Sequence, residues 1–182
     1  SFWLKLKKMI YIKYIIVIYN YMDSNIYNEK FIKKKINVNF DELNKNIDNL
    51  LLKKIKHLFE NTCNETGFIK KDSVELIQRT NGYVSQYVDL STVQFTVIFK
   101  CMICNPSPGL IIKCNVIETI KPGLIAELFP LSIIIPLQLH TDKKSFNSIN
   151  IGDTISVKIM DSKFKKNEKE IQAVGILADD KK

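Results

Sequence analysis

The fold of this chain is decided by residues 109–139, which read GLIIKCNVIETIKPGLIAELFPLSIIIPLQL. This stretch predicts three short strands in quick succession. A Lys-Pro-Gly turn at residues 121–123 separates the first strand from the second, and Phe129-Pro130 ends the second. The third strand runs from Ser132 to Pro136. Proline and glycine stand where the hydrogen-bonded ladder has to break, so they disrupt no predicted strand.

Two more strands follow after a longer link. The fourth begins at residues 151–153, and its period-two alternation places three apolar side chains on one face: Ile155, Val157 and Ile159. After a polar turn at residues 163–169, residues 171–176 supply the fifth strand. Five short strands with a longer link between the third and the fourth predict a small closed β-barrel of the OB type, which we place at residues 105–178.

The residues before the barrel predict a separate α+β domain at residues 31–104. A strand with one solvent-exposed face is expected at residues 31–40, and an amphipathic helix is expected at residues 41–60. Acidic residues begin this helix and basic residues end it, which complements the helix dipole. Its apolar stripe consists of Leu43, Ile47, Leu50, Leu51, Ile55, Leu58 and Phe59.

Three further elements complete this domain. Residues 68–77 predict a strand, and Thr-Asn-Gly-Tyr at residues 80–83 carries a tight-turn signal. Residues 93–103 predict the clearest strand of the chain, because every second residue is apolar and the other face carries Gln94, Thr96 and Lys100. At about 3.3 Å per residue, this strand is long enough to join the two domains rigidly.

Residues 1–30 are expected to be an extension, and residues 179–182 a tail. The apolar run Met9–Tyr21 is 13 residues long and contains Lys13. A membrane span needs about 20 residues. The run is therefore interpreted as an upstream extension or a misplaced start, with an interfacial or hydrophobic anchor as the alternative.

Composition limits the classes of function. The chain has 182 residues, is 46% apolar and carries a net charge of +8, which suggests a nucleic-acid partner. Residues 1–40 contain eight lysines and two acidic residues, so the remainder carries only +2. Any contact with RNA must therefore come from local lysines. Four cysteines without a disulfide framework indicate a reducing compartment.

No catalytic, metal or cofactor site is predicted. Cys101 and Cys104 would lie on opposite faces of their strand, and a zinc site usually needs two such pairs. We therefore expect buried structural thiols. Neither His57 nor His140 has a matched nucleophile or carboxylate in a motif, and the six glycines form no phosphate-binding loop.

An ordered set of fragments resembles a known family. The fragments are FIKKKINVNF (31–40), CNETGFI (63–69), VQFTVIFKCMICNPSPG (93–109), IETIKPGLIAELFPLSIIIP (117–136), INIGDTISVKI (149–159) and AVGILADD (173–180). Together they resemble the seventh subunit of eukaryotic RNA polymerase II and its archaeal RNA polymerase counterpart. The resemblance covers about residues 31–180, and it is the order of the fragments that makes it specific.

This resemblance implies a non-catalytic stalk subunit of a DNA-directed RNA polymerase. A truncated RNP-like tip domain would dock on the polymerase core, and an OB barrel of the S1 class would contact nascent RNA. The implied partner is a small helical protein, the fourth polymerase subunit or its archaeal counterpart. The chain would work in the nucleus if cellular, and in the virion or at a host-cell transcription site if viral. The implied docking residues are Asn64, Glu65, Thr66, Gly67, Phe68, Thr80, Asn81, Gly82 and Tyr83.

The barrel departs from RNA-binding relatives in its second and third strands. Aromatic rings that stack on bases usually stand there, whereas this chain has Leu124, Ile125, Ile133 and Ile134. RNA binding should therefore be weak, mostly electrostatic and steeply dependent on salt. The candidate RNA-binding residues are Lys113, Lys121, Lys143, Lys144, Lys158, Lys163, Lys165, Lys166 and His140.

Two other functions remain open. A free-standing RNA-binding adaptor in translation or RNA decay could use the same barrel, although such a protein would be expected to keep stacking aromatics. A membrane-tethered protein would depend on residues 1–21. The domain at residues 31–104 and the long connecting strand favour the polymerase stalk.

Overall fold

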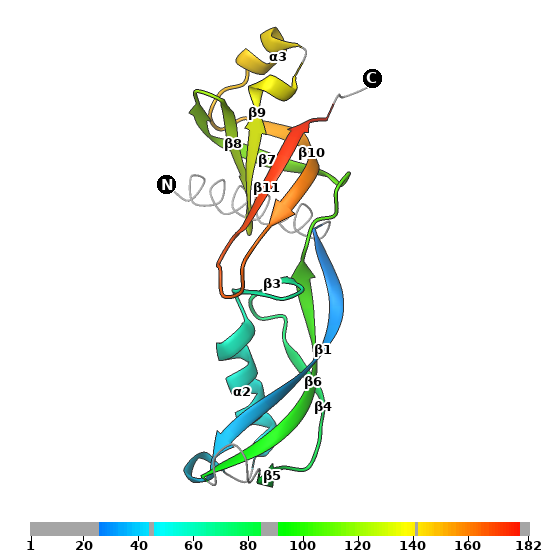
Figure 1. Ribbon diagram of the computed structural model, residues 1–182, viewed down its shortest axis with the longest axis vertical. Coiled ribbons are helices and arrows are strands. Elements are labelled where there is room, and N and C mark those ends of the chain that lie inside the picture. Colours follow the sequence, from blue (N-terminus) through cyan, green and yellow to red (C-terminus); the bar gives the residue numbers. More distant parts are fainter. Residues whose placement is uncertain (1–25, 44–45, 85–90, 141, 179–182) are drawn as a thin grey trace, which may run out of the picture. The chain divides into compact units, whose positions relative to one another are not determined.

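The computed structural model describes residues 26–43, 46–84, 91–140 and 142–178 (Figure 1). The prediction for residues 1–21 lies outside the described residues. The chain divides into two compact units. The sheet unit holds Asn28–Cys104 together with Phe164–Glu170, and the barrel unit holds Asn105–Lys163 and the described residues from Ile171 on. Most of the regular structure is β, with few helices, which is compatible with the predicted α+β class.

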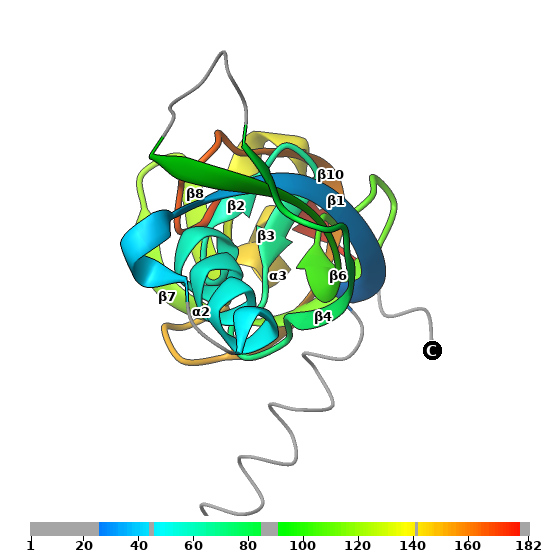
Figure 2. The same ribbon diagram turned by 90° about the horizontal axis from the view of Figure 1, so that it is seen from below.

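A strongly curved sheet forms the frame of the sheet unit. Its strand order is β1 (Tyr27–Asn39), β6 (Thr92–Cys104), β3 (Gly67–Ile69) and β2 (Cys63–Asn64). Two more strands, β4 (Glu75–Arg79) and β5 (Tyr83–Val84), also pair with β6. Strand β1 begins earlier than the predicted start at Phe31. In Figure 2, helix α2 lies inside the curve of β1, β6 and β4.

The predicted helix at residues 41–60 begins later than expected. Phe40–Glu42 form a 3-10 turn, η1, and helix α2 spans Ile47–Phe59. The side chain of Asn46 accepts a hydrogen bond from the backbone N–H of Asn49 at 3.2 Å. This cap satisfies a donor that has no partner within the helix, so α2 starts there and not at Asp41.

The apolar stripe of α2 packs on the sheet, with one exception. Leu51 and Ile55 are completely buried, and Phe59 stacks on Phe99 of β6 with ring centroids 5.7 Å apart. Leu58, a member of the predicted apolar stripe, is 52% exposed and does not pack on the sheet. The dipole pattern holds within the shorter helix, because Asp48 lies in the first turn and Lys56 and His57 lie in the last.

The predicted strand at residues 68–77 is broken into β3 and β4. The break contains Asp72, whose backbone has a φ of +57° and therefore leaves the extended conformation. The tight turn predicted at residues 80–83 was also wrong, because β4 and β5 both pair antiparallel with β6 and the chain does not reverse between them. A Cβ on Gly82 would lie 2.4 Å from Val93 Cγ1, so close packing requires this glycine.

Strand β6 carries the core of the sheet unit, as its alternation predicted. Its apolar face is buried and packs with residues of β1 and α2. The members of this face are Val93, Phe95, Val97, Phe99, Cys101 and Ile103. The opposite face is partly exposed and carries Gln94, Thr96 and Lys100.

The predicted five-stranded barrel is confirmed. Its strands are β7 (Ile111–Ile120), β8 (Gly123–Leu128), β9 (Leu131–Pro136), β10 (Thr154–Lys163) and β11 (Ile171–Leu177). They close in the order β10-β11-β9-β8-β7, with β9 and β11 parallel and all other neighbours antiparallel. This arrangement is compatible with an OB-type barrel.

The link between β9 and β10 contains a 3-10 turn, η2 (Leu137–Leu139), and a short helix, α3 (Lys143–Asn147). The sequence predicted only a longer link. Inside the barrel, alternate apolar residues are buried, among them Cys114, Ile133 and Val157. A Cβ on Gly175 would lie 2.3 Å from Val157 Cγ1, so the interior has no room for a side chain there.

Candidate functional surfaces

The eight predicted RNA-binding lysines are all exposed. Among the residues that the structure describes, none of the eight has an acidic partner within salt-bridge distance. They come from four parts of the chain: Lys113 on β7, Lys121 in the turn to β8, Lys143 and Lys144 on α3, and Lys158, Lys163, Lys165 and Lys166 on β10 and the turn after it. Their charges are therefore available to an anionic partner.

Strand pairing brings Lys113 and Lys158 to the same outer part of the barrel. Lys113 pairs with Ser156, and Lys158 pairs with Ile111, so the two lysines are diagonal neighbours on adjacent strands. Diagonal neighbours of this kind lie about 7–8 Å apart. A pocket of about 460 Å³ lies beside Lys113, and it is lined by Lys113, Thr154, Ile155, Ser156, Leu177 and Ala178. Two adjacent ammonium groups next to a hollow could bind a phosphate and the nucleoside attached to it.

The other lysines are more dispersed. Lys143 and Lys144 occupy the first turn of α3, where the carboxylate of Asp142 accepts hydrogen bonds from the backbone N–H groups of Lys144 and Ser145. Hydrogen bonds from Ser145 and Lys144 hold the pKa of Asp142 below its ordinary value. Lys165 and Lys166 lie in the segment that belongs to the sheet unit, where the N–H of Cys63 donates to the carbonyl of Glu168 at 2.7 Å.

One row of residues across the outer face of β8, β9 and β11 is aliphatic and contains no aromatic ring. Ile125 pairs with Ile134, and Ile134 pairs with Val174, so the three side chains form a row across three strands. Ile134 is 41% exposed. Leu124 and Ile133 face the interior and are buried. Phe129, which follows β8, is 48% exposed.

The side chain of His140 is held within the barrel unit by hydrogen bonds and by ring packing. Its Nδ1 lies 2.9 Å from the carbonyl oxygen of Pro136, and its Nε2 accepts a hydrogen bond from the backbone N–H of Leu177 at 2.9 Å. The ring also packs on Phe146, which is buried, with centroids 4.8 Å apart. Both ring nitrogens are engaged within the barrel unit, which leaves neither for RNA.

The first predicted docking segment, Asn64 to Phe68, is largely internal. Asn64 is buried, and its side-chain oxygen accepts hydrogen bonds from Thr66 N, Thr66 Oγ1 and Gly67 N at 2.7–3.0 Å. These bonds close the β2–β3 hairpin. Gly67 and Phe68 are also buried, whereas Glu65 and Thr66 are exposed and Glu65 pairs with Lys34 at 3.6 Å.

All four residues of the second predicted docking segment, Thr80 to Tyr83, are exposed. Two apolar neighbours that the sequence analysis did not single out extend it. Val84 pairs with Val93 at the start of β6, and the N–H of Phe40 donates to the carbonyl of Ser91 at 3.1 Å. Tyr83, Val84 and Phe40 are each 45–48% exposed. We call these three residues the end surface, since the pairing of β5 and the hydrogen bond of Phe40 place them all near the start of β6.

The four cysteines are buried and form no disulfide. Burial raises the pKa of the Cys114 thiol to about 12. Burial, followed by the nearby carboxylates Glu168 and Glu60, raises the pKa of Cys63 and of Cys101 to about 11. A raised thiol pKa disfavours the thiolate that metal binding and nucleophilic chemistry require. In the described part of the chain, no group of His, Cys, Asp and Glu is arranged to hold a metal ion.

None of the helices in the described residues is both long enough and apolar enough to span a membrane.

A closed five-stranded barrel with unpaired surface lysines is compatible with an OB-type nucleic-acid-binding protein. No family model matches the chain. A protein of Acanthamoeba polyphaga mimivirus, named "Putative DNA-directed RNA polymerase subunit", is 26% identical to this chain over 167 residues. The matched region covers 85% of this chain and 83% of the viral protein.

Proposed function

We propose that this chain is a non-catalytic stalk subunit of a DNA-dependent RNA polymerase. In this function, residues 31–104 form an RNP-like tip that docks on the polymerase core. Residues 105–178 form an S1-type OB barrel that contacts nascent RNA, and a small helical partner completes the stalk.

The extent of the similarity to the viral polymerase protein carries this proposal. A match over 85% of the chain is too long to involve the barrel unit alone. A free-standing RNA-binding adaptor would share the barrel but would have no reason to share the sheet unit. The exposed lysines of the barrel support the RNA contact, although the aliphatic row on β8, β9 and β11 indicates that this contact is weak.

The decisive experiment is affinity purification of the tagged full-length chain from the cells or virions that contain it, followed by mass spectrometry. Large polymerase subunits and one small helical protein are expected to co-purify. Recovery of ribosomal or RNA-decay components without a polymerase would overturn the proposal and support the free-standing adaptor.

Docking on the core is proposed to use the end surface together with Thr80, Asn81 and Gly82. Exposed aromatic and apolar side chains at the centre of an interface often carry most of its binding energy. The double variant Tyr83→Ala/Val84→Asp is expected to reduce co-purification of polymerase at least about tenfold. Ile151→Asp, at a more exposed apolar site in the barrel unit, is the control and should leave recovery unchanged.

A further inference from the structure

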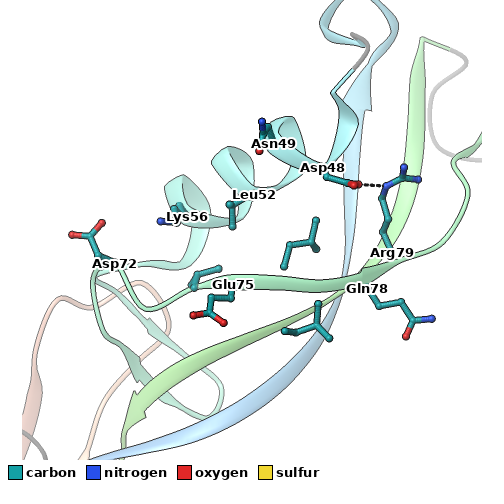
Figure 3. A pocket seen from close by; sticks show the side chains of 11 residues that line it. Asp48, Asn49, Leu52, Lys56, Asp72, Glu75, Gln78 and Arg79 are labelled. Carbon is teal, nitrogen blue, oxygen red and sulfur yellow. Dashed lines mark hydrogen bonds and ion pairs between the residues drawn. The ribbon is translucent and has the colours of Figure 1, made fainter.

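An open groove runs between helix α2 and strand β4 of the sheet unit (Figure 3). Its volume is about 780 Å³, within the range of protein ligand sites. The α2 wall consists of Asp48, Leu52 and Lys56, which follow one another at helical spacing, together with Asn49. Arg79 of β4 pairs with Asp48 and closes one end of the groove, while Asp72 and Glu75 lie toward the other end.

The other wall of the groove is a strand edge. Strand β4 pairs with β6 on one side, and in the described residues no strand pairs with its other side. Every second residue of such an edge strand directs its N–H and C=O away from its partner. The N–H of Val74, just before β4, already has an acceptor in Glu60 Oε1 at 3.1 Å. The following residues of β4 line the open groove.

The two outer edges of this sheet differ in how well they are protected against the addition of another strand. Strand β1, at the opposite edge, carries Lys30, Lys33, Lys34 and Lys35, and closely spaced lysines are a common device against strand addition. Strand β4 instead exposes Ile77 by 52% into the groove. The register of β4 with β6 shifts at Ile77, so a bulge divides this edge, but β4 carries no lysine, which leaves it the less protected of the two edges.

We propose that the groove binds an extended segment of a partner polypeptide, which adds to the sheet as a strand beside β4. Only an extended backbone presents donors and acceptors at the spacing of a strand edge. The five residues of β4 span about 17 Å, with the bulge at Ile77 between two pairs of residues that are in regular register with β6. A helix or a compact small molecule would leave these backbone groups without partners.

The walls of the groove specify the side chains of this segment. Leu76 pairs with Phe99 on the core face, and Leu52 projects from α2 on the same side, so residues of the segment that face α2 should be apolar. Glu75 pairs with Lys100 on the outer face at 3.2 Å. The outward residues of the segment should therefore be polar, with a lysine beside Glu75.

The proposal can be tested by NMR on the full-length, isotope-labelled chain with a panel of synthetic peptides. The peptides have about seven residues, alternate valine with threonine or lysine, and include both chain directions, because strands can add in either. Binding should shift the amide signals of β4 and of the groove face of α2. A peptide with identical side chains but N-methylated backbone amides should not bind, because it lacks the donors that pair with β4.

Two matched variants locate the site. Ile77→Lys should weaken peptide binding at least about tenfold, because it gives β4 the lysine protection that β1 already has. Phe31→Lys makes the same kind of change at a 62% exposed apolar residue on β1, and should leave binding within about twofold.

Three results would overturn the proposal. One is the absence of binding by every peptide at a Kd of about 1 mM or tighter. Another is equal binding of the N-methylated peptide, which would indicate apolar contact without strand pairing. The third is self-association of the chain through β4, detected by light scattering and abolished by Ile77→Lys, which would make a second copy the occupant.

Discussion

The Nε2 atom of His140 accepts a hydrogen bond from the backbone N–H of Leu177 at 2.9 Å. His140 lies in the link after β9, whereas Leu177 ends β11, the last strand of the barrel. Because Nε2 is the acceptor, the proton of the neutral ring is on Nδ1, where it can bond to the carbonyl of Pro136. One side chain thus joins the link to the final strand.

We expect His140→Ala to destabilise the barrel. Removing the ring leaves the half-buried N–H of Leu177 without its acceptor and exposes Phe146, which together should cost about 1–3 kcal/mol in urea unfolding. RNA affinity of the folded variant should stay within about twofold of the wild type. Leu139→Ala, at the exposed neighbouring residue, is the control and should change stability by less than about 0.5 kcal/mol. Unchanged stability with weakened RNA binding would instead make His140 an RNA ligand.

Lys113 and Lys158 should account for a measurable part of RNA binding. Each contact between a lysine and a phosphate of single-stranded nucleic acid contributes about 0.7 to the slope of log K against log salt. The double variant Lys113→Gln/Lys158→Gln should therefore lower the slope by about 1.4, measured by fluorescence anisotropy with an unstructured RNA.

The double variant Lys53→Gln/Lys71→Gln is the matched control for this measurement. It removes the same net charge from exposed lysines of the sheet unit, and should leave the slope unchanged. Equal effects of the two double variants would show that only net charge matters and that the lysine pair on β7 and β10 is no site.

The barrel could be predicted strand by strand because its signals are local. The pleat of a strand is visible in the alternation of apolar residues at Ile155, Val157 and Ile159. The ends of strands are visible in the prolines Pro122 and Pro130, which cannot donate to the hydrogen-bonded ladder. Strand β6 could be predicted for the same reason, because its alternation of residues is also a local signal. Helix α3 spans only five residues, which is too short for a periodic pattern, so the sequence showed only a link.

Other features depend on distant neighbours and could not be read from local sequence. The Asn-Gly signal at residues 80–83 was overridden because β6 pairs with the chain on both sides of it. Phe40 and Val84 look like ordinary core residues, and only the sheet geometry leaves them exposed. The role of His140 depends on a contact with Leu177, which the sequence gives no means to anticipate.

The thiol of Cys114 should be inert in the folded protein. Its pKa of about 12 lies far above the ordinary value of about 8.5, so at pH 8 only about one thiol in ten thousand is ionised. Alkylation by iodoacetamide should be at least about a hundredfold slower than in urea, as followed by mass spectrometry. Rapid alkylation of Cys114 without denaturant would contradict its burial.

The same raised pKa makes stability depend on alkaline pH. The folded state keeps the proton of Cys114 while the unfolded state loses it, so the stabilisation is complete below about pH 8.5 and is lost as the pH rises toward 12. The free energy of unfolding should therefore fall as the pH rises above about 8.5. In Cys114→Ala this fall should be shallower, and an unchanged pH dependence would argue against the shift.

A ring placed on the aliphatic row should strengthen RNA binding. Ile134 lies between Ile125 and Val174 on the outer face and is 41% exposed, so a larger side chain can be accommodated there. Stacking of one base on an aromatic ring contributes about 1–3 kcal/mol, so Ile134→Trp should raise the affinity for single-stranded RNA by about fivefold or more. Ile151→Trp, at a 65% exposed site before β10, is the control. An equal gain in both variants would mean that any surface ring suffices and that the outer face of β8, β9 and β11 does not lie along the path of the RNA.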